Sequence, residues 1–228
     1  MKKTWIITGS SSGIGLEMTK KLLQAGKKVM GISRRQALID SMDYQQLFCD
    51  FSNLDNINQL QFEKNNLEGV IFCHGYGEFK HLEEFKQDAM ISLMNVNLLS
   101  IMIMTKNLIQ ALKKQPQAYL IFIGSEAGLD GKTRSSVYSA SKFGLRGFVQ
   151  SIRKECASSA IKVTIIQPGL TRTPFYDNQY FEPKADEKCA IAPQDIAATL
   201  DIILAGSVGT TFDEIIINPQ AHAIKFKN

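Results

Sequence analysis

A tyrosine and a lysine stand four residues apart in the segment Tyr138-Ser139-Ala140-Ser141-Lys142. Side chains at this spacing share one face of a helix. A free phenol, with a pKa of about 10, is a poor base at neutral pH, but a neighbouring ammonium group stabilises the phenolate and lowers that pKa. Such a tyrosine can give a proton to a carbonyl oxygen or take one from an alcohol. An isolated pair of this kind is usually no more than two surface neighbours.

Ser125 supports the catalytic interpretation of this pair. It follows the apolar run Tyr119–Gly124, which is predicted to be a buried strand, and it precedes Tyr138 by thirteen residues. In a parallel α/β sheet the carboxyl ends of the strands form the ligand crevice. We therefore expect the Ser125 hydroxyl to reach the same carbonyl oxygen as Tyr138 and to hold it by a hydrogen bond.

A second candidate site is the glycine-rich segment Thr8-Gly9-Ser10-Ser11-Ser12-Gly13-Ile14-Gly15, which joins a predicted strand to a predicted helix. Such a turn brings backbone N–H groups and a helix N-terminus to one point, where a pyrophosphate binds. Glycine is required where a phosphate approaches the backbone closely. The spacing GxxxGxG differs from the common dinucleotide fingerprint GxGxxG, and a flexible Gly/Ser turn is the alternative interpretation.

The next predicted strand ends in Gly31-Ile32-Ser33-Arg34-Arg35. In dinucleotide-binding folds an acidic residue at this place holds the ribose 2′-hydroxyl of NAD, whereas an arginine accommodates the 2′-phosphate of NADP. Ser33 supplies no acid, and guanidinium groups such as those of Arg34 and Arg35 pair well with phosphate. The sequence therefore favours NADP(H) as cofactor, and an exposed pair of loop arginines is the alternative.

Short apolar strands alternate with amphipathic helices along the chain, and these elements must position the candidate residues. The apolar runs are continuous and rich in β-branched residues, which indicates strands buried on both faces. The alternation predicts a single α/β domain with a doubly wound parallel sheet, a Rossmann fold. The predicted strands cover 4–8, 28–33, 45–49, 69–73, 119–124, 162–166 and 214–217. The predicted helices cover 14–23, 54–62, 82–114 in one or two pieces, 136–158 and 193–204.

The composition excludes several other classes of protein. The chain has 228 residues, of which 44% are hydrophobic, and this excludes a disordered chain. Its 26 basic and 22 acidic residues give a net charge of +4, and the basic residues occur in scattered pairs rather than in the dense tracts of nucleic-acid-binding proteins. Four widely spaced cysteines without a CxxC motif and three separate histidines predict neither a disulfide scaffold nor a metal site.

The cysteines and the apolar segments of the chain indicate where in the cell the protein is located. Unpaired thiols suit a reducing compartment. The N-terminal run Trp5-Ile6-Ile7 is stopped by Thr8-Gly9 and is shorter than the apolar core of a signal peptide. The apolar stretch Leu98–Met104 is too short to cross a bilayer. We therefore expect a cytoplasmic protein that does not enter a membrane.

Taken together, these motifs resemble the short-chain dehydrogenase/reductase family over nearly the whole chain. The TGxxxGxG motif of that family corresponds to 8–15, and its PGxxxT motif corresponds to Pro168-Gly169-Leu170-Thr171-Arg172-Thr173. Its acidic residue after the third strand corresponds to Asp50, and its helix asparagine corresponds to Asn97. Its serine, tyrosine and lysine fall on Ser125, Tyr138 and Lys142 at the expected spacings.

The resemblance implies a role for each matched residue. Tyr138 would donate or accept the proton, and Ser125 would orient the carbonyl group. Lys142 would lower the pKa of Tyr138 and bond the nicotinamide ribose, and Asn97 would link Lys142 to a water relay. Thr173 would bond the nicotinamide carboxamide. The residues expected to bind NADP(H) are Gly9, Ser11, Ser12, Gly13, Ile14, Gly15, Ser33, Arg34, Arg35, Asp50, Gly75, Tyr138, Lys142, Pro168, Gly169, Thr171 and Thr173.

Two segments depart from the pattern of this family. Where Asn-Ala-Gly usually follows the fourth strand, this chain has Cys73-His74-Gly75. Gly75 keeps the close approach to the cofactor, but Cys73 cannot make the two-way hydrogen bonds of an amide, so the stabilisation of the sheet is in question here. His74 is expected to be a polar residue on the rim rather than an additional acid or base. The ending Phe212–Pro219 is similar to a shorter, NADP-preferring branch that reduces small aldehydes, ketones or oxo acids.

The segment 171–192 lies where the family has a mobile substrate lid. It contains Phe175, Tyr176, Tyr180 and Phe181. These aromatic side chains either favour an apolar or aromatic carbonyl substrate or simply pack the lid against the core. Glu126 and Arg134 are further candidates for substrate contact.

The sequence thus favours the reduction of a small aldehyde, ketone or diketone by NADPH. An NADP(H)-binding sensor without turnover is the alternative from a different class, and an NAD-linked alcohol dehydrogenase is a third hypothesis. The family resemblance further implies a homodimer or homotetramer in which the helices 82–114 and 136–158 pair across a two-fold axis.

Overall fold

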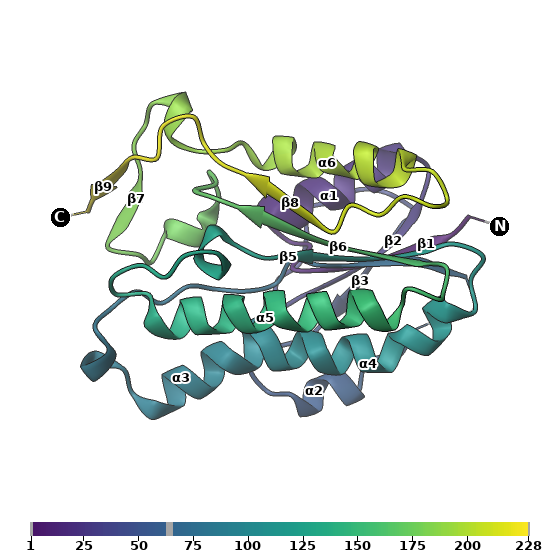
Figure 1. Cartoon of the computed structure of the whole chain (residues 1–228), viewed down its shortest axis with the longest axis horizontal. Coiled ribbons are helices and arrows are strands. Elements are labelled where there is room, and N and C mark those ends of the chain that lie inside the picture. The colour runs from purple at the N-terminus through teal and green to yellow at the C-terminus, as the bar shows by residue number, and fades with distance from the viewer. Residues whose placement is uncertain (1, 63–65, 228) are drawn as a thin grey trace.

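The computed structural model describes residues 2–62 and 66–227 and has a seven-stranded parallel sheet at its centre (Figure 1). The strand order is β3-β2-β1-β4-β5-β6-β8, which confirms the predicted doubly wound Rossmann fold. The strands are β1 (Thr4–Thr8), β2 (Lys28–Ser33), β3 (Tyr44–Phe48), β4 (Leu67–Phe72), β5 (Ala118–Ile123), β6 (Ile161–Pro168) and β8 (Glu214–Ile217).

Helices cover both faces of the sheet (Figure 1). On one face lie α1 (Gly13–Gln24) and α6 (Pro193–Ala205), and on the other lie α2 (Asp55–Asn58), α4 (Ser100–Lys113) and α5 (Ser136–Glu155). Successive strand residues point to opposite faces, so Trp5 and Ile7 of β1 pack in the core that contains α1 and α6, whereas Ile6 packs in the core that contains α4 and α5. Both sets of side chains are buried, which explains the continuous apolar run in β1.

The direction of winding reverses between β1 and β4. From β1 the chain continues outward to β2 and β3, and it then returns to place β4 on the other side of β1. In open parallel sheets a ligand binds at the carboxyl ends of the strands where the order reverses. The glycine-rich segment 8–15 follows β1, and Cys73-His74-Gly75 follows β4, so both loops lie at this point.

The predicted helical stretch 82–114 consists of four pieces. A 3-10 turn, η1 (Leu82–Glu84), is followed by α3 (Gln87–Met94), by a π-helical turn η2 (Asn95–Leu99) and by α4. π-Helical turns inside α-helices are rare and occur often at functional sites. This one carries Asn97.

The predicted helix 54–62 is shorter in the structure, where α2 ends at Asn58. The local sequence is rich in asparagine, whose side chain competes for backbone hydrogen bonds and favours turns. Asn53 Oδ1 accepts the Asp55 N–H at 3.0 Å, and Asn56 Nδ2 donates to the Asp50 carbonyl at 3.1 Å. These bonds stabilise a turn at the place where the sequence pattern predicts a longer helix.

The continuous run Gln87–Lys113 is long and apolar enough to cross a membrane by length and composition alone. A core helix of a soluble protein passes the same test. Here one side of the run packs against the sheet through Ile101 and Leu108, which are fully buried. Leu99 and Met102 on the run remain exposed, so part of its apolar surface is not covered by this chain.

Two short strands outside the main sheet are absent from the sequence-based prediction. β7 (Phe181–Pro183) lies in the lid segment 171–192, and it pairs in antiparallel register with β9 (Ile224–Phe226). The lid also contains two 3-10 turns, η4 (Pro174–Tyr176) and η5 (Glu187–Cys189). Through this pairing the segment 218–227 lies beside the lid at one end of the molecule (Figure 1).

Candidate active site

Tyr138 and Lys142 lie near the start of α5, and both side chains are buried. Leu145 and Val149 continue the same helix and pack in the core against the sheet, which holds the first turns of α5 beside the carboxyl end of β5. Lys142 Nζ donates a hydrogen bond of 3.1 Å to the Ile123 carbonyl oxygen at the end of β5. The predicted helical pair is therefore fixed over the edge of the sheet where ligands bind.

Ser125 follows β5 and is the N-cap of a 3-10 turn, η3 (Glu126–Gly128). Its Oγ accepts the Ala127 N–H at 3.1 Å, and its own N–H donates to Gln167 Oε1 at 2.7 Å. A hydroxyl that accepts one bond still has its own proton to donate. Ser125 can therefore donate to a carbonyl oxygen while the capping bond holds it in place.

Burial determines the acidity of the Tyr138–Lys142 pair. Burial raises the pKa of the Tyr138 phenol to about 12, against the smaller opposing effect of a hydrogen bond with Ser125. Burial also lowers the pKa of the Lys142 ammonium to about 8. Burial is the largest effect on both groups, because each charged form loses hydration in the same enclosed place. Tyr138 consequently keeps its proton at neutral pH. That Lys142 lowers the pKa of Tyr138 stays a prediction.

Asn97 is fully buried on η2. Its Oδ1 accepts the Tyr76 N–H at 3.0 Å, and its Nδ2 donates to the Tyr76 carbonyl at 2.8 Å and to Ser141 Oγ at 3.2 Å. Asn97 thus joins the loop after β4 to α5. A Cβ on Gly75 would lie 3.2 Å from Asn97 Oδ1 and 3.8 Å from Lys142 Nζ, so the glycine leaves room beside both groups. The water relay remains a prediction.

One cavity of about 460 Å³ collects the residues predicted to react. Ser125, Tyr138 and Lys142 all line it. Of the predicted cofactor-binding residues, Ile14, Gly75, Pro168, Gly169, Thr171 and Thr173 line the same cavity. Asn97 and the rest of the predicted cofactor set, Gly9, Ser11, Ser12, Gly13, Gly15, Ser33, Arg34, Arg35 and Asp50, lie outside its lining.

The glycine-rich loop has the backbone that a bound pyrophosphate requires. Gly9 and Gly13 have φ angles of 71° and 55°, in the left-handed region that favours glycine. A Cβ on Gly15 would lie 2.3 Å from the Gly9 carbonyl oxygen, and a Cβ on Gly13 would lie 3.2 Å from Thr173 Cγ2. The loop is a backbone-lined cradle that side chains would fill, and it fits the pyrophosphate of a dinucleotide.

The end of β2 presents the two arginines that the sequence analysis assigns to the cofactor. Ser33 is buried, and its Oγ donates to the Arg35 carbonyl at 2.7 Å. Arg34 and Arg35 are exposed. Arg35 Nη2 donates to Ser12 Oγ in the glycine-rich loop at 3.3 Å, so this guanidinium lies beside the pyrophosphate cradle.

Asp50 is exposed two residues after the end of β3. Its Oδ1 accepts the Ser52 N–H at 3.0 Å. This bond is the main cause that lowers the pKa of the carboxyl group, and the Arg34 guanidinium adds to the effect. Asp50 therefore stays ionised at the same edge of the sheet as the arginines.

The segment after β6 connects the cofactor cradle to the lid. The Gly169 N–H donates to the Ile217 carbonyl at 2.8 Å, and Thr171 Oγ1 donates to the Gly169 carbonyl at 3.0 Å. Thr173 caps η4 by accepting the Phe175 N–H at 3.4 Å. Thr173 lies against Gly13 of the glycine-rich loop, and its bond to the nicotinamide carboxamide stays a prediction.

His74 is buried, so the prediction of a polar rim residue is wrong. Its Nδ1 lies 2.6 Å from Thr8 Oγ1, its Nε2 lies 2.8 Å from Ser100 Oγ, and its ring stacks on Phe51 with 3.9 Å between the centroids. Both nitrogens are engaged, which also argues against an acid–base role. The Cys73 thiol cannot replace an amide, but the His74 ring joins β1, the loop after β4 and α4 instead.

The aromatic residues of the lid both pack against the site and line its cavity. The Phe175 ring centroid lies 5.9 Å from that of Tyr138, and Phe79 lies 5.2 Å from Tyr138 and 5.1 Å from Phe181. Phe175, Tyr176, Tyr180 and Phe181 all line the cavity. The two interpretations of these side chains are therefore compatible, since the layer that packs the lid down is also an apolar wall for a ligand.

The cavity lining includes residues that the sequence-based prediction does not name as site residues, among them Lys132, His222 and Ile224. The two from the C-terminal segment reach the cavity through the β7–β9 pairing, and a three-residue strand is too short for periodicity to reveal. Lys132 precedes α5 in a loop that carries no recognisable motif. Of the two further candidates for substrate contact, Glu126 lines the cavity.

Arg134, the other candidate for substrate contact, is not part of the cavity lining. Its backbone has a φ of 62°, which is unusual for a residue with a side chain. Its Nε donates to His81 Nε2 at 3.1 Å, and its guanidinium lies 5.4 Å from the centroid of the Tyr180 ring. Arg134 therefore supports the outside of the lid.

A cradle for a pyrophosphate and a buried proton donor open into one crevice at the switch point of a parallel sheet. A protein of this construction is an oxidoreductase that binds a nicotinamide dinucleotide. The family model described as short chain dehydrogenase matches residues 3–183. The chain belongs to the short-chain dehydrogenase/reductase family, as its motifs predict.

Similar proteins include reductases and dehydrogenases. The chain is 32% identical over 184 residues to a 3-oxoacyl-(acyl-carrier-protein) reductase of Buchnera aphidicola, covering 76% of this chain and 75% of that protein. It is 27% identical to a sepiapterin reductase of Chlorobaculum tepidum over 99% of both chains. A 4-hydroxyisoleucine dehydrogenase mutant complexed with NADH and succinate has a TM-score of 0.85 at 25% identity, covering 97% of this chain and 99% of that one. A serine dehydrogenase complexed with NADP+ has a TM-score of 0.80 at 20% identity, with 94% of each chain covered, and shows likeness of fold alone.

Proposed function

We propose that this protein uses NADPH to reduce a small aldehyde, ketone or diketone. The observation that carries the proposal is the Tyr138 phenol, which is buried in the cavity beside Ser125 and keeps its proton at neutral pH. A protonated phenol is the form that reduction needs, because the carbonyl oxygen must receive a proton. The reductases among the similar proteins support the same direction.

Each of the side chains that line the cavity has a separate role in the proposed reduction. The bound cofactor would supply a hydride to the carbonyl carbon. As the C=O π bond breaks, its electron pair moves to the oxygen, and Tyr138 donates its hydroxyl proton there. Ser125 holds the same oxygen by a hydrogen bond, and the Lys142 ammonium stabilises the phenolate that remains. The aromatic lid residues exclude water from the reacting atoms.

The preference for NADPH over NADH rests on the end of β2. Ser33 provides no carboxylate for a ribose 2′-hydroxyl, and its Oγ is already bonded to the backbone. Arg34 and Arg35 are exposed, and Arg35 lies beside the glycine-rich loop. A guanidinium group can pair bidentately with a phosphate. These side chains suit a 2′-phosphate better than a ribose hydroxyl.

The test of this function is cofactor consumption over a panel of aldehydes, diketones, quinones and β-keto thioesters, with NADPH and NADH compared. We expect turnover of a carbonyl compound with a lower Michaelis constant for NADPH. Arg34→Ala should raise the constant for NADPH more than that for NADH, because only NADPH has the second phosphate. Equal changes for both cofactors would contradict the assignment of Arg34.

The same panel separates the alternative functions. A sensor would bind NADPH tightly and turn over none of the compounds. An NAD-linked alcohol dehydrogenase would oxidise alcohols with NAD+ and show no preference for the phosphorylated cofactor. The presence of Ser125, Tyr138 and Lys142 together in the cavity lining favours the enzyme, because a sensor has no need of a proton donor there.

We also propose that two copies of the chain associate through α4 and α5. A Cβ on Gly144 of α5 would lie 2.9 Å from Cδ2 of Leu98, which belongs to η2 just before α4, so α5 and η2 are in close contact. Beside this contact Leu99, Met102 and Phe143 are 39%, 37% and 43% exposed. Sedimentation at micromolar concentration should show a dimer or a tetramer, and Met102→Lys should shift it to monomer. A wild-type protein that sediments only as a monomer would contradict the proposal.

A cytoplasmic location is proposed as well. Cys49, Cys73, Cys156 and Cys189 are all unpaired. Free thiols persist in reducing compartments. Three of the four are buried, so they behave as small apolar side chains in the core.

A further inference from the structure

Glu126 places a carboxylate beside the reacting groups. It follows Ser125 at the start of η3, lines the cavity and has a side chain that is 25% exposed. A Cβ on Gly169 would lie 3.3 Å from Glu126 Oε2, so the carboxylate rests against the loop that follows β6. In both Tyr138 and Tyr176 burial is the main cause that raises the pKa, and the Glu126 charge adds to it. The carboxylate therefore acts on both phenols at the wall of the cavity.

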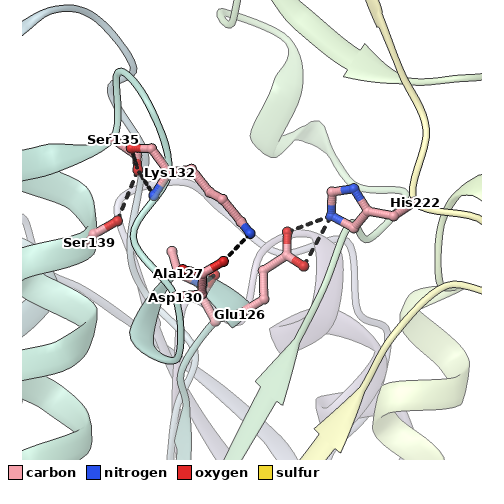
Figure 2. Close-up of polar contacts among 8 residues, drawn as sticks. Glu126, Ala127, Asp130, Lys132, Ser135, Ser139 and His222 are labelled. Atoms are coloured by element: carbon pink, nitrogen blue, oxygen red, sulfur yellow. Dashed lines mark hydrogen bonds and ion pairs between the residues drawn. The ribbon is translucent and has the colours of Figure 1, made fainter.

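The His222 ring points at this carboxylate (Figure 2). Its Nε2 lies 2.8 Å from Glu126 Oε1 and 3.0 Å from Oε2. One N–H is thus shared by two oxygens, while a carboxylate offers about four acceptor sites. Glu126 keeps acceptor capacity on both oxygens for a ligand in the cavity.

The neighbouring cation is engaged elsewhere. Lys132, which also lines the cavity, is paired through Nζ with Asp130, and both side chains are more than half exposed. Figure 2 shows the Glu126 carboxylate between the His222 ring and the end of the Lys132 side chain. Two side chains therefore lie around the carboxylate: the His222 ring holds it, and the Lys132 ammonium group is paired with its own partner at the mouth of the cavity.

These contacts define a specificity-determining residue, an inference that rests on the proposed function. We propose that Glu126 selects carbonyl substrates that carry a hydroxyl or amino group on the carbon next to the reacting carbonyl, and that His222 is its positioning residue. With the carbonyl oxygen held by Ser125 and Tyr138, a substituent one bond away faces the residue that follows Ser125. A hydroxyl or ammonium group would donate to the carboxylate, whereas a carboxylate substituent would be repelled. The aromatic wall takes the apolar remainder of the substrate.

The experiment uses phenyl ketones of nearly equal size. α-Aminoacetophenone and α-hydroxyacetophenone carry a donor, propiophenone carries a methyl group in its place, and benzoylformate carries a carboxylate. Wild-type protein with NADPH should show a kcat/KM for the two donor ketones at least about tenfold above that for propiophenone, since hydrogen bonds to charged groups contribute at this level. Benzoylformate should be the poorest substrate.

Two variants test the residues named. Glu126→Gln removes the charge and should reduce the preference for the ammonium substrate over propiophenone, measured as the ratio of their kcat/KM values, by about tenfold or more. His222→Ala should weaken the same preference through KM rather than kcat, and His222→Gln, which restores an N–H donor, should recover part of it. Glu155→Gln is the matched control, because it removes the same charge from the exposed end of α5. It should leave the preference unchanged.

The outcomes distinguish this inference from the function on which it rests. If wild-type protein reduces carbonyl compounds of the general panel but does not prefer the donor ketones, or if Glu126→Gln lowers all substrates equally, the role of Glu126 is wrong and the function stands. If no carbonyl compound is reduced, the proposed function fails. Calorimetry can also compare the affinities of the protein for the product alcohols of the donor ketones and of propiophenone, without turnover. Equal affinities for the alcohols with and without the donor group would also overturn the inference.

Discussion

Replacing Tyr138 by phenylalanine should abolish carbonyl reduction while leaving NADPH binding intact. The hydroxyl is the group that would protonate the substrate oxygen, and general acid catalysis contributes about two to four orders of magnitude to a rate. The ring of the variant keeps its packing against Phe79 and Phe175. We therefore expect kcat to fall by at least about a hundredfold. The dissociation constant for NADPH should stay within about twofold of wild type, since the other residues expected to bind the cofactor are unchanged.

Tyr176 offers a matched control, because it is a second tyrosine in the same cavity with a pKa that burial raises. Tyr176→Phe should retain turnover to within a few-fold. Titration of cofactor fluorescence and steady-state rates on the same preparations give both quantities. Turnover retained by Tyr138→Phe, or lost equally by Tyr176→Phe, would refute the assignment of Tyr138 as proton donor.

His74 should make the fold sensitive to acid. The Ser100 hydroxyl donates to the Val96 carbonyl at 2.8 Å, so it accepts from His74 Nε2–H, and Nδ1 then accepts from Thr8. The neutral ring is satisfied in this way and has no place for a second proton. Burial, with the Lys142 ammonium as a second cause, lowers the pKa of His74 to about 3 from its ordinary 6.5.

Because the pKa of His74 is lower in the folded protein than in the unfolded chain, acidification should destabilise the fold. Between pH 6.5 and about 3 the unfolded chain binds a proton at His74 that the folded chain refuses, so the free energy of unfolding falls as pH falls through this range. The loss can reach about 5 kcal/mol for a fully buried group. Above pH 6.5 this contribution is complete and the stability is independent of His74 titration.

Urea unfolding at about pH 8 and about pH 5 measures this effect. His74→Gln cannot titrate, so it should be less stable than wild type at the higher pH and should lose less stability on acidification. Near pH 5 most carboxyl groups remain ionised, which keeps their contribution similar in the two proteins. Parallel losses in wild type and variant would contradict a neutral buried His74.

The parts of the fold that repeat a strong local pattern were predictable from the sequence. The strand bounds Thr4–Thr8 and Glu214–Ile217 are found as predicted, because runs of apolar, β-branched residues favour strands. The meeting of Ser125 with Tyr138 was equally accessible, since the carboxyl ends of parallel strands share one edge. Spacing and topology together were sufficient for these features.

The features that the sequence did not predict depend on partners that are distant in the chain. The two ring nitrogens of buried His74 form hydrogen bonds with Thr8, 66 residues away, and with Ser100, 26 residues away. A local sequence pattern cannot predict contacts between residues so far apart in the chain. The pKa of Tyr138 depends on how completely the lid and the core enclose it, which residue spacing does not describe. β9 is too short to be recognised before its partner strand is known.

The pairing of β7 with β9 has a consequence for exchanging parts between relatives. Phe181 is in register with Phe226, and the Lys227 N–H donates to the Tyr180 carbonyl at 2.8 Å. If the lid alone were replaced by that of another enzyme, the new lid strand would lack the β9 sequence with which it evolved to pair. His222 would then face lid side chains from a different protein. A chimera designed for a new substrate therefore needs the lid and the segment 218–227 from the same donor protein. Substitutions in one of these segments also limit the substitutions that the other can tolerate.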